Sequence, residues 1–337
     1  MRPAARGGRG RAPGAARPRH LRGEAEAGRQ GPPGVLGELG RRRERRPPAA
    51  RLDPRHRRPH PRARLQRGQR GLPRHPLRRH RAVGGRFCYS TVKVPTPAEM
   101  CQAKQDGLTV LMSIGGAAAG IDLNSTAVAD RFVATIVPLL KKYNFDGIDI
   151  DIETGLVGSG SITRLSPSQA NLIRIIDGVL AQMPAGFGLT MAPETAYVTG
   201  GSVAYGSIWG AYLPVVKKYA DNGRLWWLNM QYYNGSMYGC SGDSYSAGTV
   251  AGFKAQTDCL DRGLVVQGTT VRVPYDKQVP GLPAQPGAGG GYMAPGLVAQ
   301  AWNPYGGRLK GLMTWSLNWD GSRNWTFGDN VRALQGR

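Results

Sequence analysis

The first 86 of the 337 residues contain no aromatic residue and no Ile, Lys, Ser, Thr, Asn or Cys. Arg, Gly, Pro and Ala account for 63 of these residues, and 26 Arg stand against only five acidic residues. A segment with so few core-forming side chains cannot bury enough apolar surface to offset the entropy lost on ordering. We therefore expect residues 1–86 to be a non-globular Arg/Pro/Gly-rich segment, joined near Gly85 to a chain of a different kind.

Three interpretations of residues 1–86 stay open. The segment is a disordered tail, a basic arm that binds nucleic acid or another anionic surface, or a frame or start-site artefact. Arg, Ala, Gly and Pro have codon families built from G and C, so a GC-rich gene read in a shifted frame yields this mixture. Basic arms usually carry Lys, Ser and Thr as well, and none is present here. We expect no nucleic-acid partner.

Hydrophobic runs of signal-peptide length near the start, or of membrane-spanning length anywhere, are also absent, so no membrane partner is expected. No Cys-x-x-Cys or Cys/His spacing indicates a zinc site, and we expect neither a metal nor a cofactor. The glycine run at residues 287–291 follows a predicted strand but lacks the strand-to-helix context of a phosphate loop.

Four Cys remain, all after residue 86. Cys240 and Cys259 enclose a Gly/Ser-rich loop and a predicted helix. A disulfide between them is plausible in a secreted protein, with two free thiols as the alternative.

Residues 87–337 are nearly neutral, with 19 basic and 17 acidic residues, and strand-like runs alternate here with helical patterns. The strand-like runs lie at residues 108–114, 147–153, 188–192, 225–233, 278–282 and 309–317. The helical patterns lie at residues 97–104, 127–143, 168–182, 207–219, 247–261 and 295–302. This alternation predicts a parallel sheet with crossover helices. Six such units are visible, whereas a (β/α)8 barrel has eight and places its active site at the C-terminal strand ends.

The most informative run is the acidic strand at residues 145–153. Because strand side chains alternate, its last three acids share one face at a spacing of about 6.6 Å, and three Ile occupy the other face. The acids are Asp149, Asp151 and Glu153, and the isoleucines are Ile148, Ile150 and Ile152. A solvated edge strand is the plain alternative, but the flanking strands are predicted to be parallel and buried. Buried carboxylates must pair or share protons, and such perturbed acids are suited to acid catalysis.

Residues 146–153 match the Asp-x-x-Asp-x-Asp-x-Glu signature of glycoside hydrolase family 18, the chitinases and their relatives. Four further segments resemble family motifs in barrel order: Ser113-Ile114-Gly115-Gly116, Met191-Ala192-Pro193-Glu194, Gln231-Tyr232-Tyr233-Asn234 and Met313-Thr314-Trp315-Ser316. The resemblance covers about residues 98–330 and is closest to the bacterial chitinase branch with compact barrels.

This resemblance implies an α/β fold, the (β/α)8 TIM barrel. The family's first two strands are rich in Tyr, Trp, Asn and Phe and lie upstream of the Ser-x-Gly-Gly motif, where this chain has its Arg/Pro/Gly segment. We therefore expect a barrel that lacks its first two strands, with residues 87–337 supplying strands three to eight of the catalytic domain.

The resemblance also implies roles for individual residues. Glu153 is the general acid, and Asp151 and Asp149 form a coupled acidic cluster that favours a proton on Glu153. No second carboxylate is placed as a nucleophile, which fits a substrate-assisted family. The substrate's N-acetyl oxygen then attacks the anomeric carbon, while Asp151 holds the acetamido N–H and Tyr233 donates to its carbonyl oxygen. Sugar-binding roles are implied for Trp315, Gln231, Asn234, Met191 and Glu194, and structural roles for Asp146, Gly147, Ser113, Gly115 and Gly116.

The expected function is a chitinase-type glycosidase that cleaves β-1,4-linked N-acetylglucosamine polymers with retention of configuration. Two alternatives share the fold: an endo-β-N-acetylglucosaminidase acting on N-glycans, and a non-catalytic chitin-binding lectin. Lectin members typically lose the terminal Glu, which is present here as Glu153. We expect a secreted monomer whose partner is chitin or chitooligosaccharides.

Overall fold

Parallel strands form the frame of this computed structural model, which describes residues 95–117 and 120–337. One sheet has the order β1 (Leu111–Gly115), β2 (Gly147–Asp151), β3 (Gly188–Met191) and β4 (Trp227–Leu228), all parallel. Strand β9 (Gly281–Pro283) pairs in parallel with β10 (Met313–Trp315). Parallel bridges from Leu228 to Gln278 and from Gln231 to Gly281 join the end of β4 to β9.

Six parallel strands thus follow one another in chain order, each inside a strand-like run of the sequence or overlapping its end. The α/β prediction with parallel strands and crossover helices is confirmed, and the assignment of these strands as strands three to eight of the barrel stays a prediction. Within the described ranges the outer edges of β1 and β10 have no strand partner. The segment expected to be non-globular, residues 1–86, lies outside the described residues.

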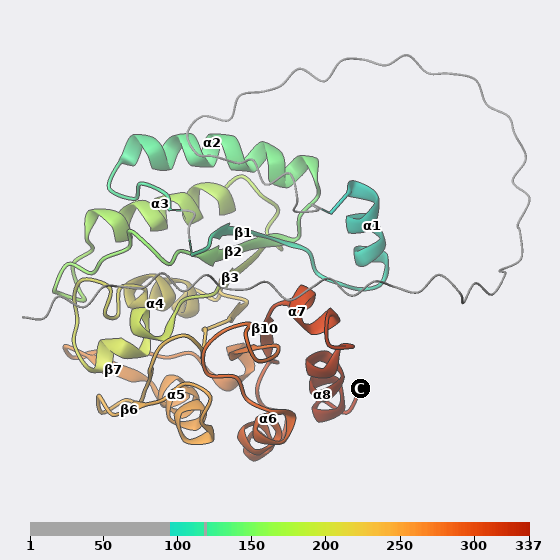
Figure 1. The fold of residues 1–337 in the computed structure, drawn as a ribbon. Helices are drawn as coiled ribbons and strands as arrows, with labels where there is room; N and C mark the ends of the chain where they lie inside the picture. The colour runs from blue at the N-terminus through green and yellow to red at the C-terminus, as the bar shows by residue number, and fades with distance from the viewer. Residues whose placement is uncertain (1–94, 118–119) are drawn as a thin grey trace, which may run out of the picture. The chain divides into compact units, whose positions relative to one another are not determined.

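Helices cover the outer side of these strands, and Figure 1 shows α2 and α3 side by side along β1 and β2. The helices are α1 Pro97–Gln105, α2 Thr126–Lys142, α3 Pro167–Leu180, α4 Leu213–Asp221, α5 Val250–Arg262, α6 Pro295–Trp302, α7 Leu317–Gly321 and α8 Thr326–Leu334. The start of α3 is a capping box: the Ser166 hydroxyl accepts from the Gln169 N–H at 3.1 Å, and the Gln169 side chain accepts from the Ser166 N–H at 2.9 Å. No helix of the described residues is long and apolar enough to cross a membrane.

The main core lies between the strands and these helices. The isoleucine face of β2 is fully buried against apolar side chains of α2 and α3. Each buried side chain of this size contributes ~1.5–3 kcal/mol relative to an exposed one. Ile148, Ile150 and Ile152 therefore turn one face of β2 toward the helices, and the acidic face points away from the helices.

The entry to β2 explains two motif residues. A Cβ atom on Gly147 would lie 2.6 Å from the Gly188 carbonyl oxygen, so only glycine lets β3 approach here. The Asp146 carboxylate accepts a hydrogen bond from the Val110 N–H at 2.8 Å and pairs with Lys104 at 2.8 Å. These contacts lie at the N-terminal end of the strand, where they join β2 to the segments that lead into β1 and β3.

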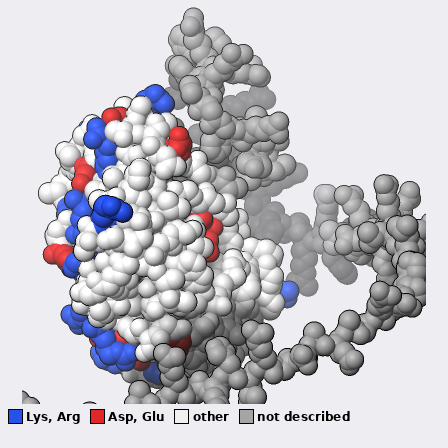
Figure 2. Space-filling view, turned by 90° about the vertical axis from the view of Figure 1, so that its left-hand side faces the viewer, with Lys and Arg blue, Asp and Glu red and all other residues white. Residues whose placement is uncertain are grey.

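Figure 2 shows one face of the molecule with Lys and Arg interspersed among Asp and Glu near its margin and a broad uncharged area between them. The basic side chains on this face lie in several separate groups, with acidic side chains among them.

Two short antiparallel hairpins flank α5 and were not predicted from the sequence: β5 (Met237–Tyr238) with β6 (Ser244–Tyr245), and β7 (Leu264–Val266) with β8 (Thr269–Val271). Their strands have only two or three residues, too few for an alternating pattern to be recognised. A disulfide between Cys240 and Cys259 joins the first hairpin to α5, whereas Cys101 is an exposed free thiol.

This disulfide should stabilise the fold measurably. Replacing Cys240 and Cys259 together by Ser is expected to lower the free energy of unfolding by about 2–4 kcal/mol, because the cross-link restricts the unfolded chain. Urea denaturation followed by circular dichroism measures the change. Cys101→Ser is the matched control and should leave the transition in place; an equal shift in both proteins would contradict the prediction.

Candidate active site

Three carboxylates lie along one face of β2 and its extension toward the C-terminal end of the sheet. Asp149 and Asp151 belong to the strand, and Glu153 follows two residues later. The C-terminal ends of parallel strands meet at one rim, which is where such folds build their sites. The predicted acidic face therefore opens at the functional rim of the sheet.

Asp149 is the most enclosed of the three acids. Its carboxylate accepts hydrogen bonds from the Thr190 hydroxyl at 2.5 Å, the Asn229 amide at 3.2 Å and the Ser113 hydroxyl at 3.3 Å. Burial raises the pKa of Asp149, and these three hydrogen bonds oppose the shift. Donors from β1, β3 and the segment after β4 thus converge on one carboxylate.

Gln231 connects the two outer acids. Its side-chain nitrogen lies 3.1 Å from Asp151 Oδ1, 3.1 Å from Glu153 Oε1 and 2.9 Å from the Ala192 carbonyl oxygen. The side chain is buried, so it holds both carboxyl groups in place within the protein. The sequence suggested that Gln231 binds sugar, and the structure adds a contact with each outer acid.

The pKa of Asp151 is raised toward neutral pH. Burial, the charges of Glu153 and Asp149 and a hydrogen bond with Glu153 raise its pKa from 3.8 to about 7. A proton therefore stays on the outer pair of acids at mildly acid pH. The raised pKa of Asp151 thus keeps a proton at the Asp151–Glu153 pair, and the expectation that Glu153 carries it as the general acid stays a prediction.

The backbone around Glu153 is held by two tyrosines that the sequence analysis did not single out. The Tyr197 hydroxyl donates to the Glu153 carbonyl oxygen at 2.7 Å. The Tyr212 hydroxyl accepts from the Ile152 N–H at 2.7 Å and donates to the Ile152 carbonyl oxygen at 3.0 Å. Tyr197 follows the Met-Ala-Pro-Glu motif closely, which was the one sequence signal available; nothing near Tyr212 points to this role.

Tyr233 lies close enough to the acids for their charges to act on its hydroxyl. Burial and the charges of Asp151 and Glu153 hold the pKa of Tyr233 well above its usual value, so its phenol stays protonated. Within the described residues this hydroxyl makes no hydrogen bond to protein. Tyr232 points the other way, as strand alternation requires, and shares a hydrogen bond of 3.0 Å with Thr257 of α5.

Glu194 is a fourth acid at this rim. It bridges in parallel to Gln231, and burial together with the charge of Glu153 raises its pKa. The structure thus brings Glu194 to the acid cluster.

Met191 lies on the other face of the sheet. It pairs in register with Ile150, while Thr190 pairs with Asp149. Since paired residues of neighbouring strands share a face, Met191 faces the helices, and its side chain is fully buried. The predicted sugar-binding role of Met191 does not agree with this placement and is corrected to core packing.

Asn234 forms two hydrogen bonds with the loop between β9 and α6. Its side-chain oxygen accepts from the Gly290 N–H at 2.8 Å, and its own N–H donates to the Gly290 carbonyl at 2.9 Å. Asn234 is exposed, and its predicted contact with sugar stays a prediction, to which the structure adds this contact with the loop.

The Ser-x-Gly-Gly motif lies at the end of β1, directly beside the acids. The Gly116 N–H donates to the Asp151 carbonyl at 2.6 Å. Gly115 has a φ of +111°, and a Cβ atom there would overlap the Asp151 carbonyl. The glycines therefore permit the close approach of β1 to β2, while Ser113 supplies a donor to Asp149.

Trp315 ends β10 at the same rim, paired in register with Pro283, and the peptide bond that follows it is cis. Its side chain is 53% exposed. A large flat side chain left open to solvent at the functional rim is available to a ligand.

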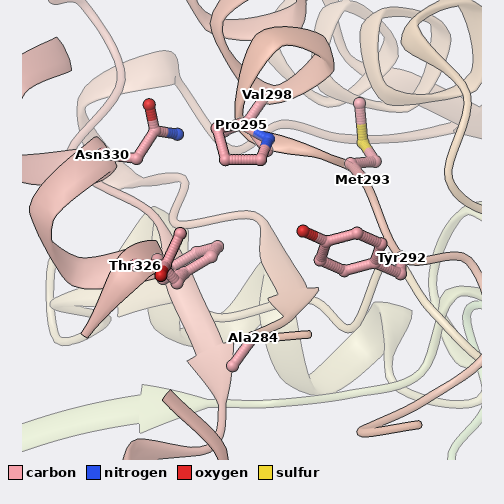
Figure 3. A pocket seen from close by; sticks show the side chains of 8 residues that line it. Ala284, Tyr292, Met293, Pro295, Val298, Thr326 and Asn330 are labelled. Atoms are coloured by element: carbon pink, nitrogen blue, oxygen red, sulfur yellow. The ribbon is translucent and has the colours of Figure 1, made fainter. Parts of the chain in front are cut away.

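A separate pocket, shown in Figure 3, contains none of these acids. Its lining residues are Ala284, Tyr292, Met293, Pro295, Val298, Thr326, Phe327 and Asn330. Its space measures about 190 Å³ and is partly open to solvent, and among the residues that the structure describes the buried Asn330 amide nitrogen has no hydrogen-bond partner. With no carboxylate it cannot perform acid catalysis. In residues 95–117 and 120–337, no group of three His, Cys, Asp or Glu side chains is arranged to hold a metal ion.

Comparisons with known proteins agree with this geometry. A family model described as glycosyl hydrolases family 18 matches residues 90–178, which include β1 and the acidic strand. Endochitinase 37 of Trichoderma harzianum is 80% identical over 241 residues, covering 72% of this chain and 72% of that protein. The solved structure of a family GH18 chitinase from Chromobacterium violaceum superposes with a TM-score of 0.64 at 28% identity, covering 72% of this chain and 68% of that one.

The branch expected from the sequence needs a correction. Chitinase Chi52 of the bacterium Paenibacillus xylanexedens is 36% identical over 276 residues, 73% of this chain and 52% of that protein. The fungal relative is far more similar, so the resemblance is not closest to the bacterial branch. With the acidic strand at the sheet rim and a relative 80% identical over most of its length, this chain belongs to glycoside hydrolase family 18.

Proposed function

We propose that this protein is a chitinase that cleaves β-1,4-linked N-acetylglucosamine chains with retention of configuration. The observation that carries this proposal is the pairing of Glu153 with Asp151 through Gln231, beside a Tyr233 hydroxyl that is free to donate. Relatives about 80% identical to this chain are named endochitinases, which favours cleavage inside the chain.

The first step is acid catalysis by Glu153. Its carboxyl group protonates the glycosidic oxygen. At the same time, the acetamido oxygen of the reacting sugar attacks the anomeric carbon of that sugar. The bond to the leaving sugar breaks, and an oxazolinium ion forms. Glu153, now ionised, takes a proton from the water molecule that attacks the anomeric carbon, and the acetamido group is restored.

Asp151 and Tyr233 support the acetamido nucleophile in this proposal. Asp151 accepts the acetamido N–H, and Tyr233 donates to the carbonyl oxygen that attacks. A buried Asp151 whose pKa is raised to about 7 is a poor nucleophile in its own right, which favours participation by the substrate. The raised pKa of Tyr233 keeps its phenol protonated at neutral pH, so that the hydroxyl can donate a hydrogen bond.

Sugar binding is proposed for Trp315, whose exposed ring would lie under the apolar face of the reacting pyranose, and for Glu194 at the same rim. Residues 87–337 form the catalytic domain in this proposal. The disulfide between Cys240 and Cys259 and a polymeric substrate favour action outside the cell. The proposed acting form is a monomer.

An N-glycan hydrolase with the same acidic strand is the second candidate. It is distinguished by a panel of chitin oligomers against a high-mannose glycoprotein. Release of glycan from the glycoprotein, with no cleavage of chitin oligomers, would replace the proposed substrate.

Glu153→Gln keeps the shape of the side chain but cannot supply the proton. The kcat on a chitin oligomer is expected to fall by about 10²–10⁴, the usual contribution of general acid catalysis, with oligomer binding largely kept. Asp130→Asn, which removes an exposed carboxylate of α2, is the matched control. Near-normal turnover by Glu153→Gln would remove this residue from the mechanism.

Participation by the substrate makes a second prediction. A thiazoline that mimics the oxazolinium ion should inhibit competitively, and fully deacetylated chitosan should not be hydrolysed, because it lacks the attacking oxygen. Reducing-end assays on both polymers measure this. Efficient hydrolysis of deacetylated chitosan would contradict the roles of Asp151 and Tyr233.

Asp151 also makes the stability depend on pH. Its pKa is 3.8 when exposed and about 7 in the folded protein, so the folded state binds more protons between these values. The contribution of Asp151 to stability is therefore present at low pH and is lost as pH rises through about 7. Asp151→Asn removes this dependence. The melting temperature of the wild type should fall relative to that of the variant between pH 4 and pH 8, a range set by those two values; a constant difference would overturn the assignment.

A further inference from the structure

Three Asn residues stand in the Asn-x-Ser/Thr pattern that marks an acceptor of N-linked glycans in secreted proteins. They are Asn124 in Asn124-Ser125-Thr126, Asn234 in Asn234-Gly235-Ser236 and Asn324 in Asn324-Trp325-Thr326. None of the three has Pro in the middle position, which would prevent the modification. The sequence therefore contains three equivalent matches, and only the fold distinguishes which of them can carry a bulky polar sugar.

Asn124 lies in the turn between β1 and α2, directly before Ser125, the N-cap of the helix. Its side chain is exposed and, among the residues that the structure describes, makes no hydrogen bond. The turn is fixed by Asn171 of α3, which donates to the Leu123 carbonyl oxygen at 2.7 Å and accepts from the Thr126 hydroxyl at 3.1 Å. The residues on both sides of Asn124 are thus attached to α3, while its own amide is open to solvent.

Asn324 lies in the turn between α7 and α8. It is exposed, and its φ of +55° is in the left-handed region, which Asn adopts more readily than most residues. Within the described part of the chain its side chain makes no hydrogen bond. The turn is closed by the Thr326 hydroxyl, which donates to the Arg323 carbonyl oxygen at 2.7 Å, and by buried Asp320, which accepts from the Phe327 N–H at 2.8 Å. The fold of this turn therefore does not depend on the Asn324 amide.

Asn234 differs from the other two in what its side chain does. Although it is exposed, its side-chain oxygen accepts from the Gly290 N–H at 2.8 Å. A Cβ atom on Gly289 would lie 3.1 Å from the same oxygen, so the loop packs closely against this side chain. Asn234 also directly follows Tyr233, the proposed donor to the acetamido group. A glycan on Asn234 would compete with the loop for the same space, beside the proposed site.

The disulfide between Cys240 and Cys259 is a second observation that bears on this modification. Disulfides form and persist in the oxidising compartments through which secreted proteins pass, and N-linked glycans are found on the surface loops of such proteins. The inference rests on the proposed action outside the cell and does not depend on the reaction at Glu153.

We propose that Asn124 and Asn324 are acceptors of N-linked oligosaccharides in a eukaryotic secretory pathway, and that Asn234 stays unmodified in the folded protein. The donor is an oligosaccharide joined through its C1 atom to a lipid diphosphate. The amide nitrogen of Asn forms a bond to C1, and the bond from C1 to the diphosphate oxygen breaks. The lipid diphosphate leaves with the electron pair of that bond, and the amide loses one proton to solvent.

The test identifies which Asn carries a glycan. The full chain is fused to a secretion leader and produced in yeast, and the soluble protein is treated with a peptide N-glycosidase in heavy-oxygen water. This enzyme converts each glycosylated Asn to Asp that carries a heavy oxygen atom. Mass spectrometry of the peptides should find this label at Asn124 and Asn324 and not at Asn234. A missing label at Asn124 or Asn324 overturns the assignment of that residue, and a label at Asn234 overturns its exclusion.

A denaturing gel of whole-cell protein keeps the test independent of folding. Asn124→Gln and Asn324→Gln should each remove one glycan, which is seen as one step of increased mobility. Asn222→Gln is the matched control, because Asn222 is an exposed Asn whose sequence Asn222-Gly223-Arg224 lacks the pattern. It should leave the mobility as in the parent. A substitution at Asn124 or Asn324 that does not change the mobility overturns that acceptor.

Hydrolysis of a chitin oligomer by the parent protein tests the proposed function separately. Hydrolysis by a protein that carries no glycan overturns only the acceptor assignment. Glycans at Asn124 and Asn324 without hydrolysis support the acceptor assignment and overturn the catalytic proposal.

Discussion

A carboxylate buried in a sheet must find hydrogen-bond donors on the neighbouring strands, and this requirement at Asp149 sets the register of the central sheet. Ser113 of β1 and Thr190 of β3 are the register partners of Asp149 and both donate to it. A slip of one residue would put an apolar neighbour in place of each donor and leave the charge without partners. Such a buried polar group costs several kcal/mol, on the order of 2–7 for a neutral group and more for a charge. Asp149 therefore helps to specify the register of the sheet, and the sheet in turn fixes the position of its carboxylate.

The number of hydrogen-bond donors falls along the strand, so two similar carboxyl groups have different surroundings. Asp149 has three protein donors, whereas Asp151 has one donor in Gln231 and two acidic neighbours. Burial raises the pKa of both aspartates, and the charges of the neighbouring acids add to this at Asp151, whose pKa is raised to about 7. Because Gln231 contacts both outer acids, a change in the charge of either is felt by the other.

Local patterns in the sequence predicted what depends on neighbours in the chain. Period-two alternation identified the acidic face of β2. The helical patterns located six helices, although α4 begins at Leu213 and the pattern placed its start at residue 207. Family motifs then placed Glu194 and Trp315 at the rim.

The rest depends on partners far apart in the chain, which no local pattern reveals. Gln231 meets Asp151 across 80 positions, and Asn234 meets Gly290 across 56. Met191 was assigned to the wrong face because its motif was read as a unit; its pairing with Ile150 decides the face, and that pairing needs the register of β3.

The two faces of β2 explain how the fold tolerates its own site. Three acids on one face oppose folding through their desolvation and mutual repulsion, and the three isoleucines on the other face are buried completely. Since side chains alternate, a shift of the strand by one residue would turn the acids toward the helices and the isoleucines toward the site. Rigid support then comes from contacts that avoid the acids themselves: Tyr197 and Tyr212 hold the backbone at Ile152 and Glu153, and glycines let β1 and β3 approach the strand closely. The carboxyl groups of Asp151 and Glu153 are thereby fixed in direction through Gln231, and the raised pKa of Asp151 keeps a proton at this pair, which is the combination that the proposed acid catalysis requires.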